Sequence, residues 1–525
     1  MRKLSCASIL TLSLLTPAVA ARQACDVELV ELVQLTSDAE FDGFPVLSFS
    51  PASPLGHLVW SKEFGTGCDR SQDLYVSEYD GRLWSPATFL AGQAPLSRHA
   101  GFSLDFAPDG GEELLVFESS LAQNLCFDEI SAQTWSGSWQ PGTTAIGDGV
   151  DDDDVMGTVR FAEDGTYALL VWCDDLDFTN EDYAIAANIY DPILGSFGPK
   201  TIIEPATGTN TMRPRHDRTL AQRPGTGEWI LVYERAGEVY FQSGLGDVNG
   251  LVWSGEQLLS SSVDPDYRPL IRFAQDGTGY AFWMQRTNGA DGELMAAAYD
   301  EQTLSFGPPI ALTSNPQEEE LFAVVPNAGG WHVIFTRFPP GESDREVFWG
   351  RFDGISLVDE ERLTDDDLDQ RQVHATADDF GRLHVTYQAD GEVWVGRLVE
   401  SNFPAMERPR YATPPNALTL NPGLTSGPIL GQVWDPWLSP FPGSVVDVLF
   451  VDLGGPIETP TPWGTLLCNV PAPFRIFKLA PGGVFSVGIP NSCSLIGRTA
   501  CSQGAVFLAP GFELSNALDL VFGTY

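Results

Sequence analysis

The tetrapeptide "HLVW" at residues 57–60 is the first of seven short apolar runs that each end in an aromatic residue. The later aromatics follow at intervals of 50 to 61 residues. A repeat of this length is typical of the four-stranded blades of a β-propeller. The other six runs are "LLVF" (114–117), "LLVW" (169–172), "ILVY" (230–233), "YAFW" (280–283), "HVIF" (332–335) and "HVTY" (384–387).

Turn residues recur at the same position relative to each of these runs. A turn rich in Gly or Asp precedes each run, and a third strand such as "DLYVSEYDG" (73–81) or "EVFWGRFDG" (346–354) follows it. Alternating helical patterns are not visible. We therefore expect an all-β fold in which residues 26–400 form a seven-bladed β-propeller.

The two ends of the repeat region complement each other. After "EVWVGRLVE" (392–400) the fourth strand of the last unit is missing, whereas "VELVQLTSDAEFDGFP" (30–45) carries a strand that precedes the first unit. We predict that this N-terminal strand closes the ring by pairing with the last blade, which removes an open sheet edge.

The chain after the repeats has a different composition. Residues 401–414 are predicted to be a Pro-rich linker, and residues 415–525 contain short alternating strands separated by Gly and Pro, which predicts a small β-sandwich. This region resembles a C-terminal module of secreted bacterial proteins of unassigned function. The resemblance rests on Ile489-Pro490-Asn491, Leu495-Ile496-Gly497, Ser502-Gln503-Gly504 and Ser515-Asn516-Ala517-Leu518.

The first residues have the features of an export signal. Residues 1–21 combine a basic start with an apolar centre and small residues near Ala20, which predicts a signal peptide and a secreted protein. Cysteine usage agrees with an oxidising compartment, because no CxxC spacing is present. The cysteines predicted to form disulfides are Cys126, Cys173, Cys468, Cys493 and Cys501, with their pairing left open.

The chain is strongly acidic, with a formal net charge of −42. Nucleic acids and anionic membranes would be repelled, so neither is an expected partner, and membrane insertion is not expected either. Asp-rich loops leave open a calcium site, for which Asp175, Asp177 and Asp182 are the candidate ligands. A solvated acidic surface is the alternative explanation of the same residues.

Three histidines occupy the same position of the repeat. His57, His332 and His384 each lie three residues before the aromatic that ends their run. Equivalent side chains are distributed around a propeller and do not converge on one ion. We therefore predict structural roles for all three.

Arginines near the predicted channel face are the candidate ligand-binding residues. They precede or begin the innermost strands, where guanidinium groups would hold a carboxylate or sulfate, unless each pairs with a neighbouring acid. The candidates are Arg98, Arg213, Arg215, Arg268 and Arg371.

One turn is partly similar to the Asp-box turns of sialidases. In "SEYDGRLW" (77–84), Ser77, Gly81 and Trp84 have the spacing of that motif, but Tyr79 stands at the position of its Asp. The resemblance implies a propeller and a sialidase-like glycosidase or a lyase as one alternative. No other catalytic motif is present. The preferred hypothesis is a secreted, non-catalytic protein that binds an extracellular glycan or protein, and a purely structural surface protein is a third possibility.

Overall fold

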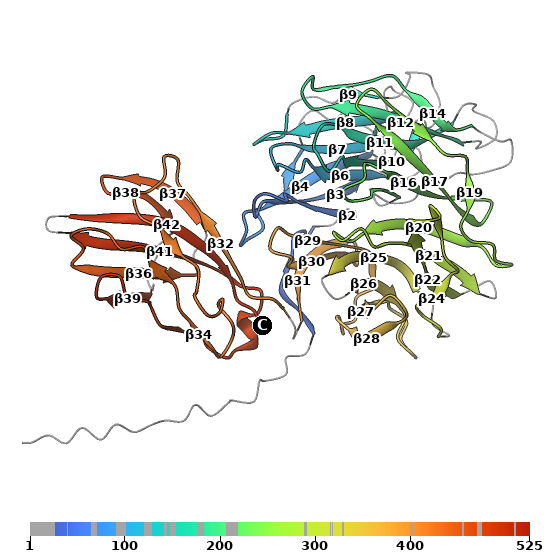
Figure 1. The fold of residues 1–525 in the computed structure, drawn as a ribbon. Coiled ribbons are helices and arrows are strands. Elements are labelled where there is room, and N and C mark those ends of the chain that lie inside the picture. Colours follow the sequence, from blue (N-terminus) through green and yellow to red (C-terminus); the bar gives the residue numbers. More distant parts are fainter. Residues whose placement is uncertain are drawn as a thin grey trace, which may run out of the picture. The chain divides into compact units, whose positions relative to one another are not determined.

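The computed structural model of the chain separates into two compact units, which are described individually (Figure 1). The first unit is Val27–Val399, and the second contains Glu400–Tyr525. The structure describes residues 27–38, 40–64, 71–90, 101–119, 129–140, 144–146, 154–175, 183–205, 219–287, 291–315, 317, 319–327, 330–400, 403–453, 456–469, 475–508 and 511–525.

The described part of the first unit consists of seven antiparallel sheets, which follow one another along the chain. The first three are β2 (Phe41–Phe49), β3 (Gly56–Phe64), β4 (Ser71–Tyr79), β5 (Thr88–Phe89); β6 (Phe102–Phe106), β7 (Glu113–Ser119), β8 (Glu129–Trp135), β9 (Thr144–Ala145); and β10 (Asp154–Phe161), β11 (Ala168–Asp175), β12 (Tyr183–Asp191), β13 (Ser196–Phe197), β14 (Thr201–Glu204).

The remaining sheets continue the pattern. They are β15 (Leu220–Gln222), β16 (Trp229–Arg235), β17 (Glu238–Asp247), β18 (Gly250–Trp253), β19 (Gln257–Leu258); β20 (Asp266–Phe273), β21 (Gly279–Thr287), β22 (Asp291–Asp300), β23 (Ser305–Phe306), β24 (Ile310–Ala311); β25 (Glu319–Asn327), β26 (Gly330–Arg337), β27 (Glu346–Phe352), β28 (Leu357–Arg362); and β29 (Gln370–Ala377), β30 (Leu383–Ala389), β31 (Glu392–Val399), β1 (Glu28–Gln34).

All seven apolar runs lie in the second strand of their sheets, from "HLVW" in β3 to "HVTY" in β30. Their side chains are almost completely buried, because both faces of the strand are covered by neighbouring sheets. The expected all-β, propeller-like fold is therefore confirmed for the described residues, among which no α-helix occurs.

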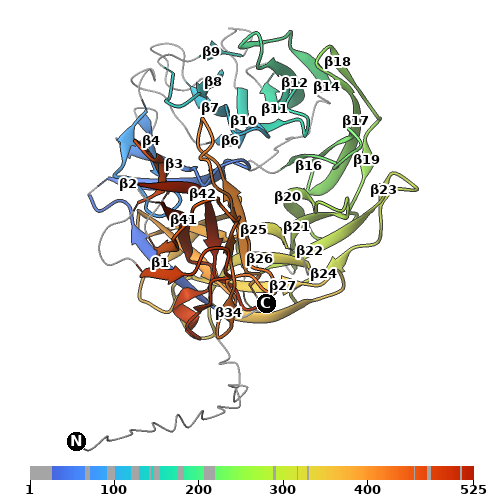
Figure 2. The same cartoon turned by 60° about the vertical axis from the view of Figure 1, so that its left-hand side comes forward.

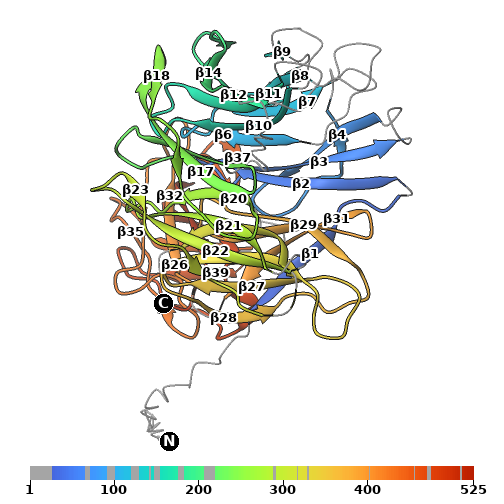
Figure 3. The same ribbon diagram turned by 90° about the vertical axis from the view of Figure 1, so that its right-hand side faces the viewer.

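The first strands of the seven sheets lie beside one another in chain order, and the last of them, β29, contacts the first, β2. Figure 2 shows the sheets following one another around a common centre, and Figure 3 shows β29 next to β2. The first strand of each sheet thus lies innermost. Side chains from strands that are far apart in sequence meet at this centre.

The N-terminal strand belongs to the last sheet of the unit. β1 pairs antiparallel with β31, with Glu28 opposite Val399 and Gln34 opposite Trp394. Further along, the Leu35 N–H donates to the Val393 carbonyl at 2.9 Å. The two ends of the unit are therefore joined by backbone hydrogen bonds.

One packing contact recurs between successive sheets. In several runs, the residue three positions before the aromatic packs against aromatic side chains of the next sheet. His332 is an exception, since its ring contact is with Trp349 of its own sheet. The His384 ring centre lies 4.5 Å from that of Phe49, and the His57 ring centre lies 5.5 Å from that of Phe106. Tyr280 makes the equivalent contact with Trp331 and Phe352.

The second unit contains a five-stranded sheet in the order β32-β42-β41-β36-β39 and three two-stranded sheets. The strands are β32 (Met406–Arg410), β33 (Leu420–Asn421), β34 (Val433–Trp434), β35 (Trp437–Leu438), β36 (Val446–Asp452), β37 (Pro456–Thr461), β38 (Gly464–Cys468), β39 (Arg475–Leu479), β40 (Val487–Gly488), β41 (Thr499–Leu508) and β42 (Gly511–Val521), with one 3-10 turn at Cys493–Leu495.

The predicted linker, residues 401–414, is wrong in part. β32 lies inside it and pairs with β42, and Arg410 forms an ion pair with Asp519 at 2.8 Å. Pro409 sits on this edge strand, where a missing N–H is tolerated. A Pro-rich composition therefore marked an edge strand and not only a connection.

The disulfide predictions have different outcomes. Cys468 and Cys501 are two of the predicted disulfide cysteines, and they are bonded to each other. The candidate Cys493 is also disulfide-bonded. Cys173 was a wrong candidate: it is a thiol, fully buried in β11 in a cluster with Tyr183 and Trp229, so it is used for packing. Cys126 and the predicted signal peptide lie outside the described residues. Within the described part of the chain, no helix is long and apolar enough to cross a membrane.

We expect a variant that lacks residues 27–34 to melt about 5 °C or more below the full-length protein and to self-associate, because the edge of β31 loses its partner. Thermal denaturation followed by circular dichroism, together with size-exclusion chromatography, measures both effects. Glu28→Gln is the control, since it changes an exposed side chain of β1 and keeps the strand. Equal melting of all three proteins would show that the β1 pairing does not stabilise the unit.

Candidate functional site

The innermost strands surround a cavity of about 170 Å³ at the centre of the first unit. Strands from six of the seven sheets line it: β2, β6, β10, β20, β25 and β29. The polar side chains of the lining are those of Ser48, Asp105, Arg160, Arg272 and Thr376. A cavity built from so many sheets is fixed in shape by the whole unit.

Asp105 is the acidic group of this cavity. Its side chain is 26% exposed, and one carboxylate oxygen accepts the Phe161 N–H at 2.7 Å. Burial raises the pKa of Asp105 to about 6, although Arg160 and the Phe161 N–H favour the charged form. Asp105 therefore changes charge near neutral pH.

Two arginines supply the positive charge. Arg160 Nη1 lies 3.6 Å from Asp105 Oδ1 and donates to the Val159 carbonyl at 3.0 Å. Arg272 Nη1 donates in the same way to the Ile271 carbonyl, also at 3.0 Å. Both guanidinium groups are thus held to their own strands at equivalent points of two different sheets.

The same strands are joined to each other by side chains that accept backbone N–H groups of the neighbouring sheet. Ser103 Oγ accepts the Val159 N–H at 3.1 Å, and His374 Nδ1 accepts the Leu47 N–H at 3.2 Å. Asp105 makes the third such bond. Polar residues at the centre therefore bind the sheets together as well as lining the cavity.

The cavity residues were missed by sequence reasoning, although a signal was present. Asp105, Arg160 and Arg272 each directly precede a Phe at the end of a first strand, in "DFAP", "RFAE" and "RFAQ". Ser48 precedes Phe49 in the same way. Alignment of the repeats on this Phe would have placed all four side chains at one level of the channel.

The predicted arginines are only partly described. Arg98, Arg213 and Arg215 lie outside the described residues. Arg371 forms an ion pair with Asp369 at 2.6 Å, and Arg268 lies over the Tyr267 ring at 5.6 Å. Asp266 and Gln370 occupy equivalent positions, so Arg268 and Arg371 are one residue apart in the repeat. Neither is among the cavity-lining residues, and their binding role stays a prediction.

The three histidines are engaged in separate contacts. His57 Nδ1 bonds to the buried carboxylate of Glu113, and His332 Nδ1 accepts the Trp349 indole N–H at 3.1 Å. Burial lowers the pKa of His332 to about 4. His384 Nε2 lies 3.2 Å from Asp378 Oδ2, beside Arg382. Each histidine thus has its own partners within or between sheets, as the repeat phase predicts.

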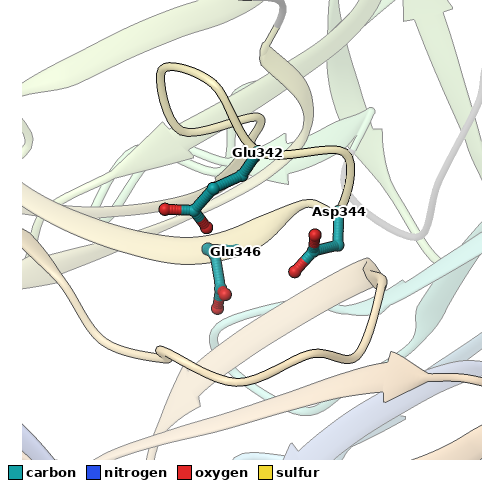
Figure 4. A group of neighbouring side chains, drawn as sticks. All are labelled: Glu342, Asp344 and Glu346. Atoms are coloured by element: carbon teal, nitrogen blue, oxygen red, sulfur yellow. The ribbon is translucent and has the colours of Figure 1, made fainter.

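Among the described residues, one acidic cluster has metal-ligand geometry, and it comes from the loop before β27 and the first residue of that strand. Oxygens of Glu342, Asp344 and Glu346 lie within 4.8 Å of one another (Figure 4). Arg362 donates to Glu342 at 2.8 Å and to Glu346 at 2.6 Å, so a guanidinium already occupies the position of a cation. The cluster is an ion-pair network at the β27–β28 edge.

The structure does not test the three predicted calcium ligands. Asp177 and Asp182 lie outside the described residues, and of Asp175 only the backbone, at the end of β11, is described. Calcium binding at these residues stays a prediction.

Comparisons with protein-family models and with curated proteins find no match. Solved structures that are similar include the β-propeller domain of the Trilobed protease from Pyrococcus furiosus, with 9% identity, 68% of this chain and 96% of that chain covered, and a TM-score of 0.41. An ulvan lyase, a polysaccharide lyase, has 8% identity, 69% and 95% coverage and a TM-score of 0.46.

The NanB sialidase from Streptococcus pneumoniae is similar at 8% identity, with 70% of each chain covered and a TM-score of 0.43. One of these three structures is described as a β-propeller domain. The all-β character of the described residues follows from their own strands and not from these similarities.

We expect Asp378→Asn to destabilise the protein by about 3–5 kcal/mol at pH 7, because Arg382 is left buried without its counter-charge. Burial alone would raise the pKa of Asp378, but Arg382 and His384 outweigh it and lower the pKa to about 2. The stabilisation is therefore complete above the unfolded pKa of about 4 and is lost as the pH falls toward 2.

Urea unfolding of both proteins at pH 7, 5 and 3 measures this difference. Asp359→Asn is the matched control, since its ion pair with Arg351 is exposed and contributes less than about 1 kcal/mol. A similar small effect of both substitutions would contradict the assignment of Asp378 as a buried ion-pair partner.

Proposed function

We propose that the first unit is a seven-bladed β-propeller closed by β1 and that the protein is an exported, non-catalytic binding protein which holds part of its ligand in the central channel. Seven sheets, the contacts of their first strands and the pairing of β1 with β31 support the ring. The predicted signal peptide, residues 1–21, supports export.

The cavity carries the binding proposal. It is lined by six inner strands and combines two arginines with one aspartate, an arrangement of few polar groups at a domain centre that is common in ligand sites. The ligand is an extracellular glycan or protein, because the acidic chain repels nucleic acid and anionic membranes.

The second unit has a separate role in this proposal. Its five-stranded sheet and three short sheets support a β-sandwich. The Cys468–Cys501 disulfide, which links β38 to β41, suits a protein that works outside the cell. We assign it a role in retention or binding at a surface, with the ligand-holding role left to the first unit.

One observation favours a second candidate function, the hydrolysis or elimination of a polysaccharide. A carboxyl group with a pKa of about 6 is suited to transfer protons near neutral pH. Asp105 has such a pKa and lies beside Arg160 in the cavity. In this alternative, Asp105 is the acid–base residue and an arginine neutralises an acidic substrate group.

A glycan array with the purified exported protein, run with and without calcium and beside a hydrolysis and elimination screen, tests the proposal. We expect binding of a restricted set of extracellular glycans without turnover, and heat-denatured protein is the control. Turnover of any bound glycan would replace the binding function by the enzymatic one. Silence in both assays would leave a protein ligand, to be sought by cross-linking, or a structural role, and would overturn glycan binding.

A further inference from the structure

The wall of the central cavity is uneven in charge. Arg160 from β10 and Arg272 from β20 contribute two positive charges, whereas Asp105 from β6 contributes one negative charge. Most of the other lining residues are apolar or small, including Val324 and Pro326 of β25. Among the side chains that line the cavity, positive charges therefore outnumber negative ones, in a chain whose formal net charge is −42.

The size of the cavity limits what it holds. Its volume of about 170 Å³ is below the range of about 300–1,000 Å³ that is usual for pockets that enclose a whole small molecule. A water molecule takes up about 30 Å³ in the liquid, so the cavity has room for a few non-hydrogen atoms with their hydration. One functional group of a larger ligand fits it.

We propose that the central cavity binds the carboxylate group of an acidic sugar between Arg160 and Arg272, and that Asp105 makes this binding pH-dependent. The inference rests on the proposed function, of which it names the ligand class. Guanidinium groups present paired N–H donors that match the two oxygens of a carboxylate. The hydrogen bonds of both Nη1 atoms to their own strands fix the orientation of the two groups.

A monoanion suits the cavity better than a dianion. The Asp105 carboxylate is 3.6 Å from Arg160 and shares its positive charge, so an incoming anion competes with Asp105 for the same guanidinium. The strongly acidic chain repels anions from the rest of its surface. Binding of an anion is therefore restricted to the cavity, where Arg160 and Arg272 lie.

The charged groups that act on Asp105 are identified in the structure. Arg160 on β10 and Arg272 on β20 attract its negative form, whereas Glu113 on β7 repels it. Burial adds to the repulsion and raises the pKa of Asp105 to about 6. Below pH 6 the neutral carboxyl no longer competes for Arg160 and donates a hydrogen bond, so a carboxylate ligand binds more tightly at pH 5 than at pH 7.5.

Isothermal titration calorimetry with glucuronate tests the inference on the full-length exported protein. Glucose is the neutral probe, and glucose 6-sulfate distinguishes a sulfate from a carboxylate. We expect glucuronate to bind at least about tenfold more tightly than glucose, and more tightly at pH 5 than at pH 7.5. Glucose 6-sulfate that binds as tightly as glucuronate would overturn the assignment of the site to a carboxylate. Equal affinity for glucose and glucuronate would overturn the inference without any variant.

Variants locate the site. Arg272→Gln is expected to weaken glucuronate binding at least about tenfold, whereas Arg351→Gln, in an exposed ion pair with Asp359, leaves it unchanged. Asp105→Asn keeps an oxygen that accepts the Phe161 N–H and is expected to remove the pH dependence while binding persists. Unchanged binding in Arg272→Gln, with melting curves that show a folded protein, would place the carboxylate elsewhere.

The inference and the proposed function fail in different ways. A glycan array that shows binding only of neutral sugars would overturn the carboxylate site and keep the binding function. Glucuronate binding that depends on Arg272, combined with turnover of an acidic polysaccharide, would keep the site and overturn the non-catalytic function.

Discussion

The arrangement of the first unit depends on how the inner edges of its sheets are satisfied. The first strand of a sheet has a partner on one side only, and backbone N–H groups on the other side need acceptors when they are buried. Ser103, Asp105 and His374 provide these acceptors to the adjacent sheet. The bonds hold neighbouring sheets at a fixed offset, and they explain why polar side chains line the centre of an otherwise apolar assembly.

The same constraint joins structure and site. Asp105 accepts a backbone N–H with one oxygen and lies near Arg160 with the other. Because Asp105 links two sheets, its side chain is held in place before a ligand arrives. Such preorganisation lowers the entropic cost of ligand binding. The position of the charged groups is therefore fixed by the inner strands and does not depend on a loop.

The sequence predicted the fold because each repeat has a strong apolar signal. Runs such as "LLVW" are buried on both faces, and their aromatics occupy the same position in the second strand of every sheet. The prediction that the three histidines lie apart was correct, because residues at equivalent positions of the repeat are distributed around the centre. Cys173 was misassigned because a buried thiol and a disulfide cysteine look alike in a sequence.

The cavity was missed because the prediction started from the loop arginines, and a bulge lies within several of the inner strands. The pairing shifts register after the first two or three residues of β2, β20 and β29. Phe44, Arg268 and Gln372 adopt positive φ at these shifts. A bulge interrupts the alternation of side chains, so counting inward from the loop arginines gives the wrong facing for the rest of the strand. The charges before the bulge were conspicuous, whereas those that line the cavity come after it.

The pairing of Glu28 with Val399 has a consequence for biosynthesis. β1 leaves the ribosome first, and its partner β31 is the last strand of the unit to be made. Until then β1 is an unpaired, partly apolar segment, which is a hazard for association between nascent chains. Glu28 and Glu31 place negative charges in this strand, and such charges discourage pairing with another copy during the interval.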